Sequence, residues 1–262
     1  MLNDFDMIKH SFDKDITIYP IADVHLGAME LNEAAWQEFI KMVQTTGAKV
    51  IFVGDLLNNS TRHTKFANPF EEAIRPRDAK RRMVEYLEPI RGQILCGVSG
   101  NHERRTYRDD DQDITYDIFS KLDIEHLYRE NIAFVKIGLG KRKSVKSKYM
   151  ASYTFAVTHG SGGGIYTGAS VNRNERFGNV IDGIDCLVVG HSHKPFVTRP
   201  SKISVDTQNE AVRMKDYTVI SCVSWLNYGG YAARSMLLPA QACKPQAIYL
   251  AAKKEKSLTT KW

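Results

Sequence analysis

Residues 16–27, ITIYPIADVHLG, join a short apolar run to a turn that carries an aspartate and a histidine. The same pattern returns as VIFVGDLLN at residues 50–58 and as QILCGVSGNHE at residues 93–103. Apolar runs of this length are typical of buried strands, and residues 33–43 and 79–87 between them place apolar side chains at helical spacing. Strands that alternate with helices predict parallel pairing with helical crossovers.

The second half of the chain is richer in predicted strands than the first. Short strands are predicted at residues 132–137, 153–158, 186–189, 217–223 and 247–251, and a helix near residues 172–180. Neither an internal repeat nor a long Pro, Gly or Ser linker divides the chain. We therefore expect an α/β fold with two packed sheets, in one domain over residues 1–262.

The composition is that of a globular protein, with 262 residues, 43% of them hydrophobic and 25% charged. It excludes disorder as the main state. No apolar run approaches the ~18 to 20 residues of a spanning helix, and the first residues lack the features of an export signal, so we expect a cytoplasmic protein without membrane contact. The four cysteines form no CxxC pair and are interpreted as reduced packing residues: Cys96, Cys186, Cys222 and Cys243.

The net charge of +6 is unevenly distributed. Residues 131–152 contribute +6 and the last ten residues contribute +3, so the rest of the chain carries −3. The cations of the first segment are Lys136, Lys141, Arg142, Lys143, Lys146 and Lys148. These segments are either a solvated hairpin and tail or the place where a bound polyanion has its distal phosphates.

Polar side chains follow five of the predicted strands, at the point where each strand ends. Because ligands collect outside the carboxyl ends of strands in α/β sheets, we expect these side chains to converge. In an extended segment, residues i and i+2 point the same way, so each Asp-x-His or His-x-His pair can serve one metal. The residues are Asp23 and His25, Asp55, Asn101 and His102, His159, and His191 and His193.

The donor types indicate which metals fit. Carboxylate, imidazole and amide donors without thiolate favour manganese, iron, zinc or nickel over a structural zinc site. Even without His102, the seven remaining donors are too many for one open metal centre. Two divalent ions bridged by a carboxylate fit better, and such pairs activate water for attack on a phosphoryl group.

The ordered motifs D-x-H, G-D, G-N-H-E, H-G and G-H-x-H resemble those of the calcineurin-like metallophosphoesterase family, over the 171 residues from Asp23 to His193. The resemblance implies a four-layer αββα sandwich, with two sheets flanked by helices, and a phosphoric ester hydrolase with two divalent ions, manganese first among them. Its implied ligands are Asp23, His25 and His193 for the first ion, Asn101, His159 and His191 for the second, and Asp55 as the bridge. His102 would be the catalytic residue that faces the phosphate.

Two departures from the patterns of known members narrow the subclass, one from the family's protein phosphatases and one from its Mre11-like nucleases. The protein phosphatases continue G-D as G-D-x-x-D-R-G, where the second aspartate pairs with the motif histidine, but Asn58 and Asn59 stand there in this chain. Because an amide does not favour the imidazolium as a carboxylate does, His102 is expected to donate a hydrogen bond to phosphate rather than act as a strong acid. About 70 residues follow His193, too few for the extra domain of Mre11-like nucleases.

Three features bear on the substrate. Arg104 and Arg105 follow the third motif and are predicted to bind substrate, more cations crowd residues 75–82, and a glycine-rich segment spans residues 160–168. Together they favour a phosphodiesterase with nuclease-like activity on nucleic acid. The alternatives are a phosphomonoesterase acting on a nucleotide, small metabolite or phosphoprotein, and a non-catalytic binding module. The aromatic residues 224–231 are interpreted as core packing, with a dimer surface or substrate wall as alternatives, and the oligomeric state is left open.

Overall fold

The computed structural model describes residues 5–61, 64, 70, 72–141, 149–162, 164, 166–239 and 244–262. Its helices are α1 (Glu33–Thr46), α2 (Pro76–Leu87), α3 (Glu103–Asp110), α4 (Ile114–Lys121), α5 (Thr167–Asn179) and α6 (Gly230–Arg234), with the 3-10 helices η2 (Glu88–Gln93) and η3 (Glu125–Leu127). In this described part of the chain, no helix is both long enough and apolar enough to cross a membrane.

The β2 sheet has the strand order β14-β13-β2-β3-β4-β5. Its strands are β2 (Ile16–Ile21), β3 (Lys49–Val53), β4 (Ile94–Val98), β5 (Tyr128–Arg129), β13 (Ala247–Leu250) and β14 (Leu258–Lys261). β2, β3, β4 and β5 pair in parallel, and α1 and α2 provide the crossovers. The carboxyl ends of three ligand-bearing strands therefore meet at one edge.

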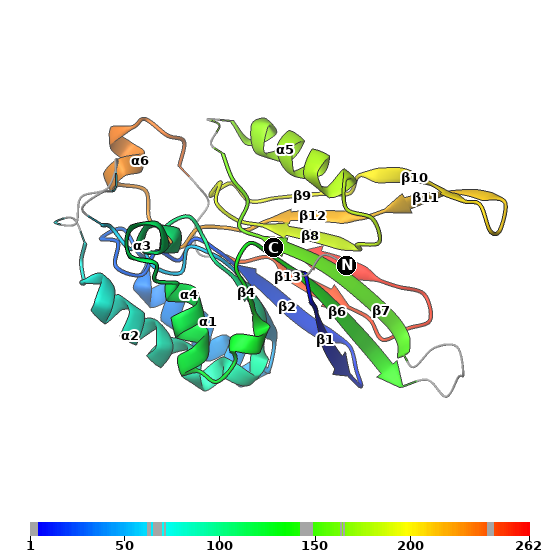
Figure 1. Ribbon diagram of the computed structural model, residues 1–262, viewed down its shortest axis with the longest axis horizontal. Coiled ribbons are helices and arrows are strands. Elements are labelled where there is room, and N and C mark those ends of the chain that lie inside the picture. The colour runs from blue at the N-terminus through cyan, green and yellow to red at the C-terminus, as the bar shows by residue number, and fades with distance from the viewer. Residues whose placement is uncertain are drawn as a thin grey trace.

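The β7 sheet has the order β1-β6-β7-β8-β12-β9. It consists of β1 (Met7–Phe12), β6 (Ile132–Lys141), β7 (Tyr149–Thr158), β8 (Cys186–Val189), β9 (Phe196–Thr198) and β12 (Thr218–Ser221). β7 and β8 run in parallel, which brings the segments after Thr158 and Val189 together. β10 (Ser201–Asp206) and β11 (Ala211–Asp216) form a separate antiparallel ribbon that projects from the body (Figure 1).

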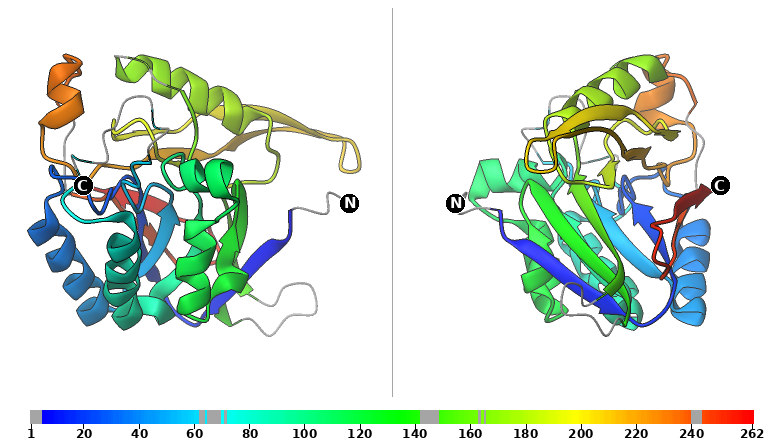
Figure 2. Two further views of the ribbon diagram at one scale, coloured as in Figure 1. Left: turned by 60° about the vertical axis from the view of Figure 1, so that its left-hand side comes forward. Right: turned by 90° about the vertical axis from the view of Figure 1, so that its right-hand side faces the viewer.

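The two sheets pack face to face around a shared hydrophobic core. This core includes Ile18, Phe52 and Ile248 from the β2 sheet and Val135 and Phe155 from the β7 sheet. The helices α1, α2 and α4 cover the β2 sheet and α5 covers the β7 sheet (Figures 1 and 2). The predicted α/β fold, with two sheets flanked by helices, is confirmed.

The strand predictions from apolar runs are close to the observed bounds. β2 and β8 match the predicted residues 16–21 and 186–189. The helix predicted near residues 172–180 begins earlier, at Thr167, and the strand predicted at 217–223 spans only Thr218–Ser221. The strands β1, β5, β9, β10, β11 and β14 and the helices α3, α4 and α6 were not predicted.

Local signals explain why α1 forms and where it ends. The Asn32 side chain accepts a hydrogen bond from the Ala35 N–H at 3.2 Å, which caps the amino end. Trp36 lies on the buried face, and the helix ends at Gly47 with a φ of 68°. Trp36 packs edge-on against Trp225, with ring centroids 5.1 Å apart. The core interpretation of residues 224–231 is therefore confirmed for Trp225, which is fully buried.

The cysteines in the described part of the chain act as predicted. Cys96, Cys186 and Cys222 are buried and free. Burial raises the pKa of each of these thiols, so the uncharged form is favoured. Cys243 lies outside the described residues.

Candidate metal centre

The loops that carry the predicted ligands have an unusual backbone. Asp23 and His25 have φ values of 55° and 53°, and His191 and His193 have φ values of 68° and 53°. Left-handed conformations are uncommon outside glycine, although Asp, Asn and His adopt them more readily than other residues. Asp23 and His25 lie in one group of candidate ligands, whereas His191 and His193 lie in two different groups. The prediction that each pair serves one metal therefore holds for the first pair and is wrong for the second, and the extended geometry assumed for both pairs is wrong.

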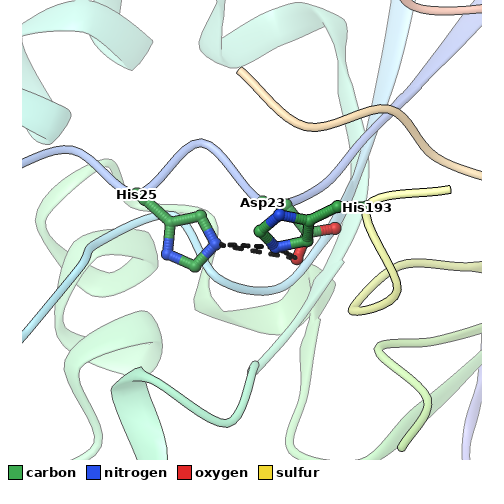
Figure 3. Close-up of side chains that lie close together, drawn as sticks. All are labelled: Asp23, His25 and His193. Atoms are coloured by element: carbon green, nitrogen blue, oxygen red, sulfur yellow. Dashed lines mark hydrogen bonds and ion pairs between the residues drawn. The ribbon is translucent and has the colours of Figure 1, made fainter. Parts of the chain in front are cut away.

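Asp23, His25 and His193 form the first group (Figure 3). Asp23 Oδ1 lies 3.2 Å from His193 Nε2 and 3.8 Å from His25 Nε2, and the two imidazole nitrogens are 3.2 Å apart. Asp23 Oδ2 accepts the His191 N–H, whereas the buried Oδ1 accepts no hydrogen bond from any described residue. An unsatisfied buried carboxylate oxygen between two ring nitrogens fits a divalent cation.

The second group consists of Asp55, His159 and His191, with Asn101 beside them. Asp55 Oδ2 lies 3.3 Å from His159 Nε2. The amide oxygen of Asn101 lies 3.0 Å from His159 Nε2 and 2.6 Å from His191 Nδ1. Carboxylate, imidazole and amide oxygen thus meet here, as the donor types predicted.

Asp55 lies between the two groups. Its Oδ2 is 3.3 Å from His159 in one group and 3.9 Å from His25 in the other. Burial alone would raise the pKa of Asp55, but His159, His102 and His25 hold it well below the usual range. Asp55 therefore stays a carboxylate. The adjacent triads indicate a dinuclear metal site.

The family model for calcineurin-like phosphoesterases matches residues 16–195. The chain belongs to the calcineurin-like phosphoesterase family. It is a metal-dependent phosphoesterase, and the expectation of a phosphoric ester hydrolase is confirmed. A search of curated proteins finds none that matches this phosphoesterase.

Solved structures of phosphoesterases resemble the chain at low identity. Yfce from E. coli is 15% identical over 94% of this chain and 98% of its own, with a TM-score of 0.39. A metallophosphoesterase from Sphaerobacter thermophilus is 14% identical over 94% and 87%, with a TM-score of 0.40. The calcineurin-like phosphoesterase YfkN from Bacillus subtilis is 11% identical over 94% and 88%, with a TM-score of 0.39.

The protonation of His159 is fixed by its neighbours in this phosphoesterase. Nδ1 lies 2.7 Å from the Val53 carbonyl oxygen, which can only accept, so Nδ1 donates and Nε2 faces the centre. Burial lowers the pKa of His159, but the Asp55 carboxylate outweighs it and raises the pKa to about 10. His159 is therefore oriented by the backbone of the strand that precedes Asp55.

Glu103 is a residue whose role the sequence interpretation missed. Its buried carboxylate accepts the backbone N–H groups of Asp55, Leu57 and Gly100 at 3.0, 2.8 and 2.9 Å. Burial and the Asp55 charge raise the pKa of Glu103 to about 7. One side chain thus ties the Asp55 loop to the loop of the third motif. The available signal was an acid directly after the Asn101-His102 pair.

His102 and Arg105 form a pair beside the centre. His102 Nδ1 lies 2.7 Å from the Asn58 carbonyl oxygen and therefore donates to it. Burial lowers the pKa of His102 to about 4, so the ring is neutral and Nε2 accepts from Arg105 Nη2 at 2.9 Å. The role of His102 as a hydrogen-bond donor to phosphate stays a prediction, and in this structure its Nε2 faces the donor Arg105 Nη2. Arg105 also donates through Nη1 to the Asn58 carbonyl oxygen at 2.9 Å, so both neighbours hold its guanidinium beside the centre.

The Asn58 side chain does not replace the missing carboxylate partner of His102. Its Nδ2 donates to Glu72 Oε1 at 3.1 Å, away from the imidazole. Glu72 Oε1 also accepts the Ser60 N–H at 2.6 Å. The departure from the G-D-x-x-D-R-G pattern therefore leaves His102 with a backbone partner.

Arg104 differs from its neighbour Arg105 in its contacts. Its Nη2 donates to Glu130 Oε1 at 2.5 Å and to the Asn131 side chain. It reaches a pocket of about 350 Å³ that opens beside the predicted ligand Asn101. We call this the α3 pocket, and its lining residues are Asn101, Arg104, Arg105, Tyr107, Arg108 and Glu130.

Two of the other cations noted in the sequence join helices rather than face the centre. On α2, Lys80 pairs with Asp117 at 2.8 Å and Arg82 with Glu33 at 2.9 Å, so these side chains join helices. In the glycine-rich segment, the Ser161 carbonyl oxygen accepts from Arg173 Nη1 at 2.6 Å. An approach of this segment to phosphate stays a prediction, and Gly163 lies outside the described residues.

The basic segment near residue 141 does not flank the metal edge. β6 and β7 pair antiparallel, with Ile132 opposite Thr158 and Lys141 opposite Tyr149. Nine residues of strand separate Lys141 from the His159 end, a distance of about 30 Å. Lys141 pairs there with Asp13 at 3.0 Å. The expectation that this segment meets distal phosphates gains no support, and Arg142, Lys143, Lys146 and Lys148 lie outside the described residues.

Proposed function

We propose that this phosphoesterase is a phosphodiesterase with nuclease-like activity. The observation that carries the proposal is the α3 pocket, which begins at Asn101 in the second ligand group and extends along α3 between arginine side chains. A monoester has no second ester group to place there. A diester has a second substituent, and a substituent with further phosphates suits guanidinium donors.

The seven predicted ligands would hold two divalent ions, with manganese as the first candidate. Asp23, His25 and His193 would hold one ion, Asn101, His159 and His191 the other, and Asp55 would lie between them. When bound, such ions polarise the phosphoryl oxygens and supply an activated water. Iron, zinc and nickel fit the same donors.

The chain's own residues orient the substrate. Arg105 would turn donors that now face His102 and Asn58 toward a phosphoryl oxygen, adding charge-assisted hydrogen bonds as negative charge develops. His102, a neutral acceptor, would keep the guanidinium beside the centre. His102 thus acts on the reaction through its contact with Arg105, and its protonation of a leaving group is not required.

Hydrolysis of bis-para-nitrophenyl phosphate and of single-stranded DNA with manganese tests this proposal. The Asp55→Asn variant loses the shared carboxylate, so we expect activity to fall at least about a thousandfold and bound metal to fall below two ions per chain. A wild type no faster than Asp55→Asn on either diester would overturn the proposal. A strong preference for the mono- over the bis-para-nitrophenyl ester would select the phosphomonoesterase alternative.

Arg105→Lys and His102→Ala separate the two roles assigned here. Lysine keeps the charge but loses the paired N–H donors, so we expect a large loss in kcat with unchanged metal content. His102→Ala should give a similar but smaller loss, because Arg105 keeps its bond to the Asn58 carbonyl oxygen. Metal content measured by mass spectrometry distinguishes either effect from a lost ion.

A further inference from the structure

The α3 pocket is lined by side chains of a helix that begins at the metal edge. Arg104 is a neighbour of both Tyr107, three residues on, and Arg108, four residues on, on the helix surface. Asn101, one turn earlier, is shared between the pocket and the second ligand group. A substrate group that fills the pocket can therefore belong to the same molecule as a phosphate bound at the metal centre.

The three arginines of the pocket are held to different degrees. Arg105 is partly buried and fixed by His102 and the Asn58 carbonyl oxygen. Arg104 is fixed by Glu130 at the pocket rim. The Arg108 side chain is 71% exposed, and its ion-pair partner within the described ranges is Asp109 at 3.8 Å. Arg108 is therefore the guanidinium with most freedom to meet an anion.

Tyr107 gives the pocket an aromatic surface. The residue is 44% exposed, and it lines the pocket between Arg104 and Arg108 in the sequence. Base stacking on aromatic side chains between basic groups is a common means of binding unpaired nucleotides. A volume of about 350 Å³ lies at the small end of ligand pockets, which matches one planar group with its sugar rather than several.

Acidic residues close the outer end of α3. Asp109, Asp110 and Asp111 follow Arg108 directly, at the end of the helix where the macrodipole is negative. A polyanionic strand that continued past the pocket would meet these charges. The pocket therefore accommodates one anionic unit and opposes the next.

We propose that the α3 pocket binds the terminal nucleotide unit of the substrate, so that the enzyme releases single nucleotides from strand ends. This inference rests on the proposed phosphodiesterase function. The base stacks on Tyr107, the outer phosphate of the unit meets Arg108 and Arg104, and the phosphate that links the unit to the strand lies beside Asn101. Hydrolysis of that link adds one water and frees one nucleotide.

The first test compares linear with circular single-stranded DNA of the same sequence. We expect the linear strand to be degraded to mononucleotides and the circle, which has no end, to stay intact. Cleavage of the circle at a rate comparable to the linear strand would overturn the inference. Failure to hydrolyse bis-para-nitrophenyl phosphate would instead overturn the proposed function itself.

The second test uses the ratio of kcat/KM for thymidine 5′-para-nitrophenyl phosphate to that for methyl para-nitrophenyl phosphate. Tyr107→Leu should lower this ratio about tenfold, whereas Tyr107→Phe, which keeps the ring, should retain it. Arg108→Ala should remove the preference for a dinucleotide that carries a terminal phosphate over one that lacks it. An unchanged ratio in Tyr107→Leu, or a preserved preference in Arg108→Ala, would overturn the inference.

Matched control variants lie far from the pocket. Tyr249 is similarly exposed, at 40%, on β13, and Arg91 on η2 forms ion pairs with Glu88 and Asp123 at the opposite ends of the strands. Tyr249→Leu and Arg91→Ala should keep both the ratio and the terminal-phosphate preference. Circular dichroism of every variant establishes that a changed ratio belongs to a folded protein.

Discussion

Replacing Glu103 by glutamine is predicted to weaken metal binding through the backbone rather than through a ligand. The hydrogen bonds of the Glu103 carboxylate go to the backbone: its two oxygens accept three N–H groups from two ligand loops. Glutamine has the same shape and only one acceptor oxygen. Its amide group would face at least one backbone donor, so a buried N–H would lose its partner.

The magnitude follows from the kind of bond that is lost. Hydrogen bonds to a charged acceptor contribute ~1.5 to 3 kcal/mol each, and a glutamine oxygen at the Oε2 position keeps two weaker ones. The variant loses the hydrogen bond to the Leu57 N–H and weakens the other two, but burying a neutral group costs less than burying a charge. Together these effects should lower the free energy of unfolding by about 3 kcal/mol. In a chain of this size, that lowers Tm by roughly 6 to 12 °C.

Urea unfolding and manganese titration by calorimetry, both well below the variant's Tm, are the assays for Glu103→Gln. We expect manganese affinity to fall about ten- to a hundredfold, as for other groups that orient metal ligands. Glu88→Gln, on the exposed η2 helix, is the control and should change stability by less than about 0.5 kcal/mol. A Glu103→Gln protein that binds manganese as tightly as wild type would refute the reasoning.

Three further changes have expected outcomes of different kinds. Gly54 has a φ of 85°, and an alanine Cβ there would lie 2.7 Å from the backbone of the next ligand loop, so Gly54→Ala should abolish metal binding. Gly47 is the control: it has a φ of 68°, but a Cβ there would meet open space. Gly47→Ala should therefore lower the free energy of unfolding by only about 1 kcal/mol, as measured by thermal unfolding. Burial raises the pKa of Glu72 in the folded protein. Protonated Glu72 therefore stabilises the folded state relative to the ionised form. This contribution to the free energy of unfolding is fully present below the usual glutamate pKa and is lost as the pH rises through the raised pKa. Glu72→Gln should therefore gain stability over wild type at about pH 8 and not at about pH 4, and an equal difference at both would contradict this. Lys256→Ala removes a 2.8 Å ion pair with the partly buried Asp185 and should cost ~0.5 kcal/mol, an effect that urea unfolding in high salt should no longer detect.

The sequence predicts elements where burial imposes an apolar pattern. β2 and β8 were located to the residue because continuous apolar runs form them. α3 was missed because its buried residue is the acid Glu103 and its other positions carry no apolar stripe. The β10–β11 ribbon was missed because most of its residues are exposed, so no contrast between a buried and a solvent face marks it.

The site was predictable in its residues but not in its geometry. Donor types and strand ends were enough to bring Asp23 and His191 to one place, 168 residues apart in the chain. The left-handed backbone of these residues depends on loop packing, which no residue pattern reports. Adjacent helical residues point about 100° apart, so the different contacts of Arg104 and Arg105 depend on how the buried Glu103 orients α3.

The position of the basic segment shows the same limit. Lys141 lies at the far end of the β6–β7 hairpin from His159 because those strands pair antiparallel in a defined register. A count of charges along the sequence does not report at which end of a hairpin the charged residues lie. Arginines on α3, which the charge segments did not emphasise, are the cations that line the pocket at the centre.

The packing of the last strands has a consequence for how the protein matures. Asp23 accepts a backbone hydrogen bond from Trp225 at 3.1 Å, and β13 pairs with β2, so residues made late in translation hold a loop made early. All the predicted ligands emerge from the ribosome before these partners do. The nascent chain therefore carries a complete ligand set without its final geometry. Loading with the correct metal should follow the synthesis of β12 and β13, when these strands have joined the two sheets.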